Sequence, residues 1–139
     1  MSRENVEQLA RHVLELLSSG DAARVNELAD PDVEWHSFFA ELADGGVYHG
    51  HEGTKRFMND INDAWETVRG DVDDAHCVGD TAVLVGHIHY RGRVSGLETE
   101  APAAWLTRFR DGRVICWRAF REPRKALEAA GLSASESRG

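Results

Sequence analysis

The first apolar residues of the chain recur at every third or fourth position. They are Val6, Leu9, Ala10, Val13, Leu14 and Leu17. This spacing predicts a helix with one buried face, which Ser2 can cap at its start and Gly20 can end. Asp21 then opens a second, short helix, "DAARVNELA", which we expect Pro31 to end. The pattern therefore places two helices before any strand.

The period changes in "DVEWHSFF", residues 32–39. Alternation predicts a strand with two different faces, one carrying Val33, Trp35 and Ser37 and the other Glu34, His36 and Phe38. The glycine-rich residues 40–53 predict a turn-rich connection with a short strand near Val47 and Tyr48. A third helix follows and is expected to end at Gly70, because one apolar stripe contains Phe57, Ile61, Ala64, Trp65 and Val68.

Four β-rich runs occupy most of the second half, at residues 71–78, 81–94, 97–110 and 113–120. The turn pairs Gly79-Asp80, Ser95-Gly96 and Asp111-Gly112 separate them, which predicts an antiparallel meander. A last short helix is expected in "EPRKALEAAGL", and residues 133–139 are expected to fray. The pattern as a whole predicts an α+β domain over residues 1–132. In it, three helices cover one face of a curved antiparallel sheet and enclose a conical cavity.

Charge and composition exclude several classes of protein. The 139 residues carry a net charge of −8, and residues 1–70 contain all of the acidic excess. Such a chain would repel a phosphate backbone, so we expect no nucleic-acid partner. The chain has neither a membrane-spanning apolar stretch nor the apolar region of a secretory signal, which predicts a cytoplasmic protein without a membrane partner. Cys77 and Cys116 have no metal-like spacing and are expected to be buried, reduced thiols.

The order of these elements resembles the superfamily of nuclear transport factor two, and within it the SnoaL-like polyketide cyclases and the ketosteroid isomerases. The similar stretches span about residues 4–132 and read "LLSSGDAARVNELADPDVEWHS", "VYHGHEGTKRFMNDI", "HYRGR" and "RFRDGRVICWRAF". The resemblance implies a cystatin-like α+β barrel with a short C-terminal helix. It leaves the activity open, because the fold carries isomerases, cyclases, dehydratases, epoxide hydrolases and noncatalytic binders.

The resemblance also assigns site positions. The aspartate base of the ketosteroid isomerases falls on His36, their tyrosine on Val13 and their protonated aspartate on Trp105. Imidazole titrates near neutral pH, so His36 is the predicted catalytic base, with Tyr48 as a hydroxyl donor near the entrance. Glu34 shares the strand face of His36 but lies roughly 6.6 Å along the strand, which argues against a direct pair.

Large apolar side chains at inward positions are expected to wall the cavity and bind a flat, hydrophobic organic ligand. The predicted ligand-binding residues are Phe38, Phe57, Trp65, Leu84, Ile88, Trp105, Thr107 and Trp117. His87 and His89 have a known metal spacing, but the same alignment turns them outward with Val83 and Val85. We therefore expect an outer sheet face that forms a homodimer, and no metal or other cofactor.

Two functions remain as hypotheses. The first is a SnoaL-like small-molecule enzyme that performs isomerisation, cyclisation or dehydration of an apolar carbonyl compound without a cofactor. The second is a noncatalytic module that binds a hydrophobic ligand or dimerises, favoured by the lost donors at Val13 and Trp105. The acid–base aspartate of the polyketide cyclases has only Glu122 as a displaced substitute. The substrate cannot be read from these residues.

Overall fold

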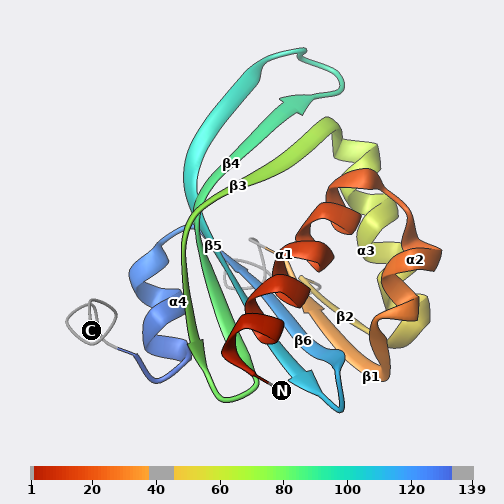
Figure 1. The fold of residues 1–139 in the computed structure, drawn as a ribbon. Coiled ribbons are helices and arrows are strands. Elements are labelled where there is room, and N and C mark those ends of the chain that lie inside the picture. The colour runs from red at the N-terminus through yellow and green to blue at the C-terminus, as the bar shows by residue number, and fades with distance from the viewer. Residues whose placement is uncertain (1, 38–45, 133–139) are drawn as a thin grey trace.

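The computed structural model describes residues 2–37 and 46–132. Its elements follow one another as helices and strands of an α+β fold (Figure 1). They are α1 (Arg3–Ser19), α2 (Ala22–Glu27), β1 (Ala29–His36), β2 (Val47–His49), α3 (Gly50–Ala64), β3 (Trp65–Val78), β4 (Thr81–Gly92), β5 (Glu98–Arg110), β6 (Arg113–Phe120) and α4 (Pro123–Ala129). The predicted fraying of residues 133–139 lies outside the described residues.

The first two helices begin where their capping residues predict. The Ser2 hydroxyl accepts a hydrogen bond from the Asn5 amide, and Gly20 ends α1 in the left-handed region at φ 80°. The predicted stop of α2 at Pro31 is wrong, because the helix ends earlier and Pro31 lies inside β1. The register between β1 and β6 shifts between Ala29 and Glu34, and such an irregularity tolerates a residue that has no amide hydrogen.

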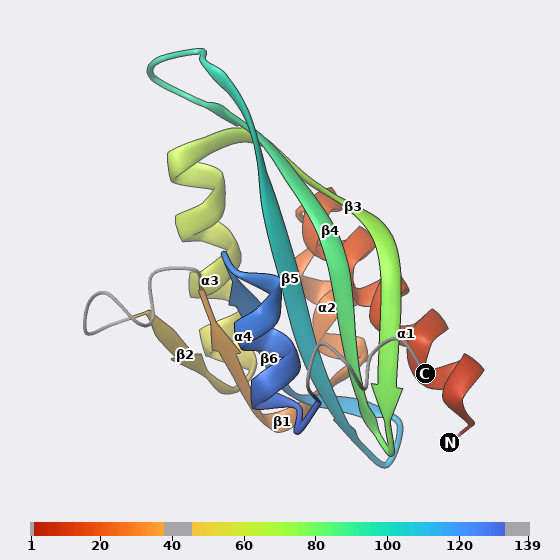
Figure 2. The same ribbon diagram turned by 90° about the vertical axis from the view of Figure 1, so that its left-hand side faces the viewer.

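The six strands form one curved sheet in the order β2-β1-β6-β5-β4-β3. Strands β3 to β6 form the predicted antiparallel meander, joined at the predicted turns. The expected antiparallel sheet has one exception, because β1 pairs with β6 in parallel. The long crossover between these two strands permits that direction. The sheet is also open, with β2 and β3 at its edges, so it curves without closing into a barrel (Figure 2).

The predicted end of the third helix at Gly70 is also wrong. Helix α3 ends at Ala64, and Trp65 begins the long strand β3. Trp65 and Val68 fit a helical stripe in the sequence, but their backbone pairs with Gly92 and Tyr90 of β4. The apolar residues alone fit either a helix or a strand at this point. The backbone hydrogen bonds to β4 decide for the strand.

The sheet has a core on each face. Helices α1, α2 and α3 cover the concave face, and the main core there includes Val6, Trp35, Leu84 and Trp105 (Figure 1). Helix α4 covers part of the opposite face with a smaller core that contains Val83, Leu106, Phe120 and Leu127 (Figure 2). Val83 lies on the outer face as expected, but α4 of the same chain buries it completely. None of the described helices is long and apolar enough to cross a membrane.

Candidate functional site

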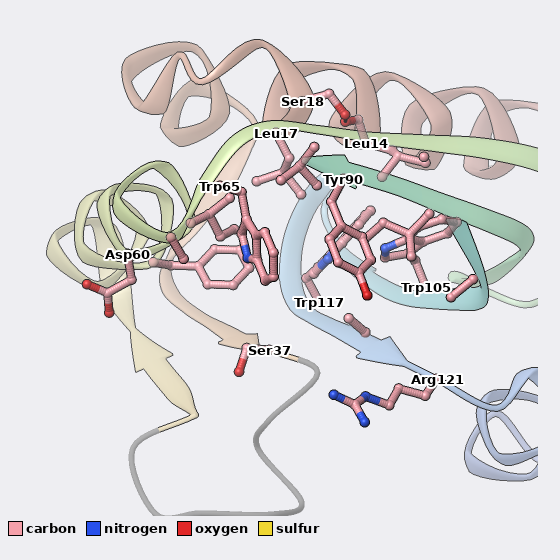
Figure 3. Close-up of a pocket in the computed structure, with 18 of the residues that line it drawn as sticks. Leu14, Leu17, Ser18, Ser37, Asp60, Trp65, Tyr90, Trp105, Trp117 and Arg121 are labelled. Carbon is pink, nitrogen blue, oxygen red and sulfur yellow. Dashed lines mark hydrogen bonds between the residues drawn. The ribbon is translucent and has the colours of Figure 1, made fainter. Parts of the chain in front are cut away.

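A cavity of about 710 Å³ lies between the concave face of the sheet and helices α1 and α3 (Figure 3). Both helices supply apolar side chains to it, and the strands β3 to β6 form the opposite wall. Its aliphatic lining includes Leu14, Leu17, Ile61, Val68, Ile88 and Ala119. A cavity of this size and polarity suits a small organic ligand.

Aromatic rings form much of this wall. Of the predicted ligand-binding residues, five line the cavity: Phe57, Trp65, Ile88, Trp105 and Trp117. The Trp65 ring meets the Tyr90 ring edge-on, with 4.6 Å between their centroids. Figure 3 shows the three tryptophans around the hollow, where Trp65 is half-buried and Trp105 and Trp117 are almost fully buried. Their binding role remains a prediction.

Two of the predicted ligand-binding residues, both in the described part of the chain, do not line the cavity. Leu84 is fully buried in the main core, beneath the packed helices. Thr107 is also fully buried, and its hydroxyl has no hydrogen-bond partner among the described residues. Both lie on the inward face as the alternation implies, but packed neighbours cover them. Phe38 lies outside the described residues.

The predicted position of His36 inside the cavity is wrong. Trp35 takes the inward position of β1, where its Nε1 donates a hydrogen bond to Thr54 Oγ1 of α3 at 2.7 Å. Because neighbouring residues of a strand point to opposite faces, His36 lies on the outer face and is absent from the cavity lining. There its Nε2 lies 3.2 Å from Glu34 Oε1, so the predicted separation of these two side chains is wrong as well. Long side chains span the distance between their backbones.

Tyr48 lines the cavity and is bonded to a carboxylate that the sequence reasoning missed. Its hydroxyl donates a hydrogen bond to Asp60 Oδ2 at 2.5 Å, and both side chains border the cavity. The hydrogen bond to Asp60 is the main cause that raises the pKa of Tyr48 to about 12, and burial adds to it. Asp60 is exposed, so the pair lies at the mouth. Its position three residues after Phe57, on the same stripe of α3, could have revealed it.

Further polar groups reach the cavity from the sheet side. Figure 3 shows the Tyr90 hydroxyl and the Arg121 guanidinium directed into it, with Ser37 beside the end of β1. Tyr90 follows Ile88 by two positions, so strand alternation could have placed it inward. Arg121 follows the last residue of β6, where alternation ends, and the sequence leaves its direction undecided.

The outward histidines lie beside carboxylates on the other face of the sheet. His87 Nδ1 lies 3.1 Å from Asp73 Oδ2, and His89 Nε2 lies 2.6 Å from Asp71 Oδ2. Neither histidine lines the cavity. Within residues 2–37 and 46–132, no three histidine, cysteine or carboxylate side chains are grouped to hold a metal ion.

The two cysteines are unpaired thiols, as the sequence predicts, but each is half-buried rather than buried. Burial is the main cause that raises the pKa of both the Cys77 and the Cys116 thiol. A raised pKa keeps a thiol protonated and poorly nucleophilic at neutral pH. We therefore assign neither cysteine a role in the site.

These features define a class of protein: an open, curved-sheet α+β fold with an apolar pocket between the sheet and its helices. The model of the SnoaL-like domain family matches residues 10–117. The chain therefore belongs to the SnoaL-like family. No curated protein matches it in sequence.

Solved structures show the same fold at low sequence identity. An NTF2-like protein of unknown function from Burkholderia pseudomallei has a TM-score of 0.74 at 22% identity, over 92% of this chain and 97% of that one. A protein of ketosteroid isomerase-like fold from Catenulispora acidiphila, in complex with trimethylamine, has a TM-score of 0.71 at 16% identity, over 91% and 95%. TerC, co-crystallised with polyporic acid, has a TM-score of 0.72 at 18% identity, over 97% and 99%. At these identities the likeness concerns the fold.

Proposed function

We propose that the protein is a cytoplasmic small-molecule enzyme that performs acid–base chemistry on an apolar carbonyl compound without a cofactor. The observation that carries this proposal is the Tyr48–Asp60 pair, which places an ionisable carboxylate at the mouth of an apolar cavity. Asp60 replaces His36 as the proposed base, because His36 lies on the outer face of the sheet. The isomerases and cyclases of this fold and the ligand-bound TerC support the proposal by analogy.

The proposed chemistry is proton transfer at a carbon next to a carbonyl group. Tyr48 donates to Oδ2 of Asp60, which leaves Oδ1 to accept the proton from the substrate carbon. With its pKa near 12, Tyr48 stays protonated at neutral pH and holds the carboxylate in place. A positioned general base typically contributes about 10²–10⁴-fold to such a step. The Tyr90 hydroxyl is a donor available to stabilise an enolate oxygen.

Deuterium exchange at the α-carbon of a bound ketone tests this assignment directly. The probe is 2-tetralone in D₂O, followed by proton NMR, with the wild-type protein and the variants Asp60→Asn and His36→Gln. We expect exchange to slow by about 10²–10⁴-fold in Asp60→Asn because the general base is lost. His36→Gln is the matched control and should exchange at the wild-type rate. Equal rates for wild type and Asp60→Asn would remove Asp60 as the base.

A noncatalytic ligand-binding module is the second candidate. It is favoured by Val13, which occupies the position of a family hydroxyl donor and is buried in the core with no polar group to offer. Trp105 occupies the position of the family's protonated aspartate, so an indole lines the cavity there in place of a carboxyl group. Saturable binding of 2-tetralone without protein-dependent exchange would identify the chain as a binder.

A further inference from the structure

The cavity carries opposite charges on two different elements. Asp60 lies on α3, and Arg121 lies just after β6 on the opposite wall (Figure 3). Among the described residues that line the cavity, these are the single carboxylate and the single cation. The half-buried rings of Trp65 and Tyr90 belong to the same lining and supply apolar surface, while Trp105 and Trp117 lie almost fully buried behind it.

This arrangement of charges fixes the orientation in which an anionic ligand can bind. A carboxylate would be repelled by Asp60 and attracted by Arg121, since Coulomb interactions are stronger in a partly dehydrated cavity than in water. A guanidinium also matches a carboxylate geometrically, through two parallel N–H···O bonds. The Tyr90 hydroxyl, which is directed into the same space, adds a neutral donor.

We infer that the cavity takes a flat aromatic carboxylate, with its anionic group on Arg121 and its ring system against the apolar lining of the cavity. The far edge of the ring system then faces the Tyr48–Asp60 pair, where the proton transfer takes place. This inference rests on the proposed small-molecule site and adds the substrate class and the direction of binding. It depends on the position of Arg121 in the cavity, whatever other contact that side chain makes.

A matched pair of ligands tests the inference. The probes are 2-naphthoate and its neutral counterpart 2-naphthamide, titrated at pH 7 by isothermal calorimetry and by quenching of tryptophan fluorescence. We expect naphthoate to bind the wild type at least about tenfold more tightly than naphthamide, the difference that one charge-assisted hydrogen bond supplies.

Two variants locate the effect. Arg121→Met should weaken naphthoate by about tenfold and leave naphthamide within about twofold, because only the charged contact is lost. Arg118→Met is the matched control. Arg118 follows the inward Trp117 on the same strand and stacks over Phe120 of the outer core, 4.8 Å from the ring centroid, so its removal should change neither affinity. Circular dichroism spectra establish that both variants are folded.

The outcomes separate this inference from the proposed function. Equal affinities of the two ligands for the wild type, or an unchanged naphthoate affinity in folded Arg121→Met, would overturn the carboxylate site and leave the apolar pocket intact. Failure of both ligands to bind would also overturn it. A naphthoate preference that depends on Arg121, together with tetralone exchange that does not depend on Asp60, would support the inference and contradict the proposed base.

Discussion

Two buried threonines differ in whether their hydroxyl groups are hydrogen-bonded. Thr54 Oγ1 accepts a hydrogen bond from the Trp35 indole at 2.7 Å and donates one to the Gly50 carbonyl at 3.2 Å. Thr107 is equally buried, and its hydroxyl has no partner among the described residues. A buried polar group stabilises a fold when it is paired and costs free energy when it is not.

Replacing each threonine by valine should therefore give different results. Thr54→Val leaves the buried indole N–H of Trp35 without an acceptor, and we expect the free energy of unfolding to fall by about 1–3 kcal/mol. Thr107→Val removes an unpaired hydroxyl and should leave the free energy of unfolding unchanged or raise it by up to about 1 kcal/mol. Urea denaturation measures both values. A similar loss in the two variants would contradict this account.

The bond between Tyr48 and Asp60 should be visible in a pH titration. Tyr48 is the only tyrosine left in a Tyr90→Phe variant, and its absorbance at 295 nm should titrate at about pH 12 rather than 10. Adding Asp60→Asn should lower this midpoint, since the carboxylate is the main cause of the raised pKa. Because the pKa is raised in the folded state, the bond stabilises the fold fully below pH 10, and this contribution is lost as pH rises from 10 to 12. An unchanged midpoint in the double variant would contradict the pair.

At the scale of elements, the irregular pairing of β3 with β4 depends on one glycine. The register shifts between Val72 and Asp74, opposite Gly86, and a Cβ at Gly86 would lie 1.9 Å from the Asp71 carbonyl oxygen. Backbone cannot move away as cheaply as the end of a side chain can. The strands can therefore approach this closely only where a side chain is missing.

Substitution of this glycine should be costly. We expect Gly86→Ala to lower the free energy of unfolding by about 1–3 kcal/mol or more, because the strands must separate. Gly92→Ala in the same strand is the control, since the added Cβ meets mainly the Ser95 hydroxyl, which can rotate. Thermal and urea unfolding compare the two variants. An equal effect of both would show that the close approach to Asp71 does not matter.

The ends of the helices show where the sequence pattern was enough to predict an element boundary. The first helix was predicted from Ser2 to Gly20 because local capping chemistry sets both ends. The third helix was predicted to run to Gly70, but it ends at Ala64. Trp65 and Val68 suit a helical stripe and a half-buried strand equally well. Only pairing with β4, a contact between segments distant in sequence, resolves that choice.

At the scale of the whole molecule, we propose that the outer sheet face that α4 leaves uncovered forms a homodimer. Helix α4 buries Val83 but leaves His87 partly exposed on the same face. Multi-angle light scattering should give a mass of about twice the 15.4 kDa of one chain, because two copies would cover this remaining face. A mass of one chain at every concentration tested would contradict the dimer.

The order of the elements, the meander of β3 to β6 and most of the aromatic wall could be predicted from the sequence, because periodicity and turn chemistry are local. The SnoaL-like family followed from the resemblance of several short stretches in their order. The tertiary structure alone decided which face of β1 turns inward, and it gave that face to Trp35 and not to His36. It also brought Asp60 to Tyr48 and Arg121 into the cavity. The alternation along a strand fixes two faces but not which of them meets the helices. That choice depends on packing between residues far apart in the chain.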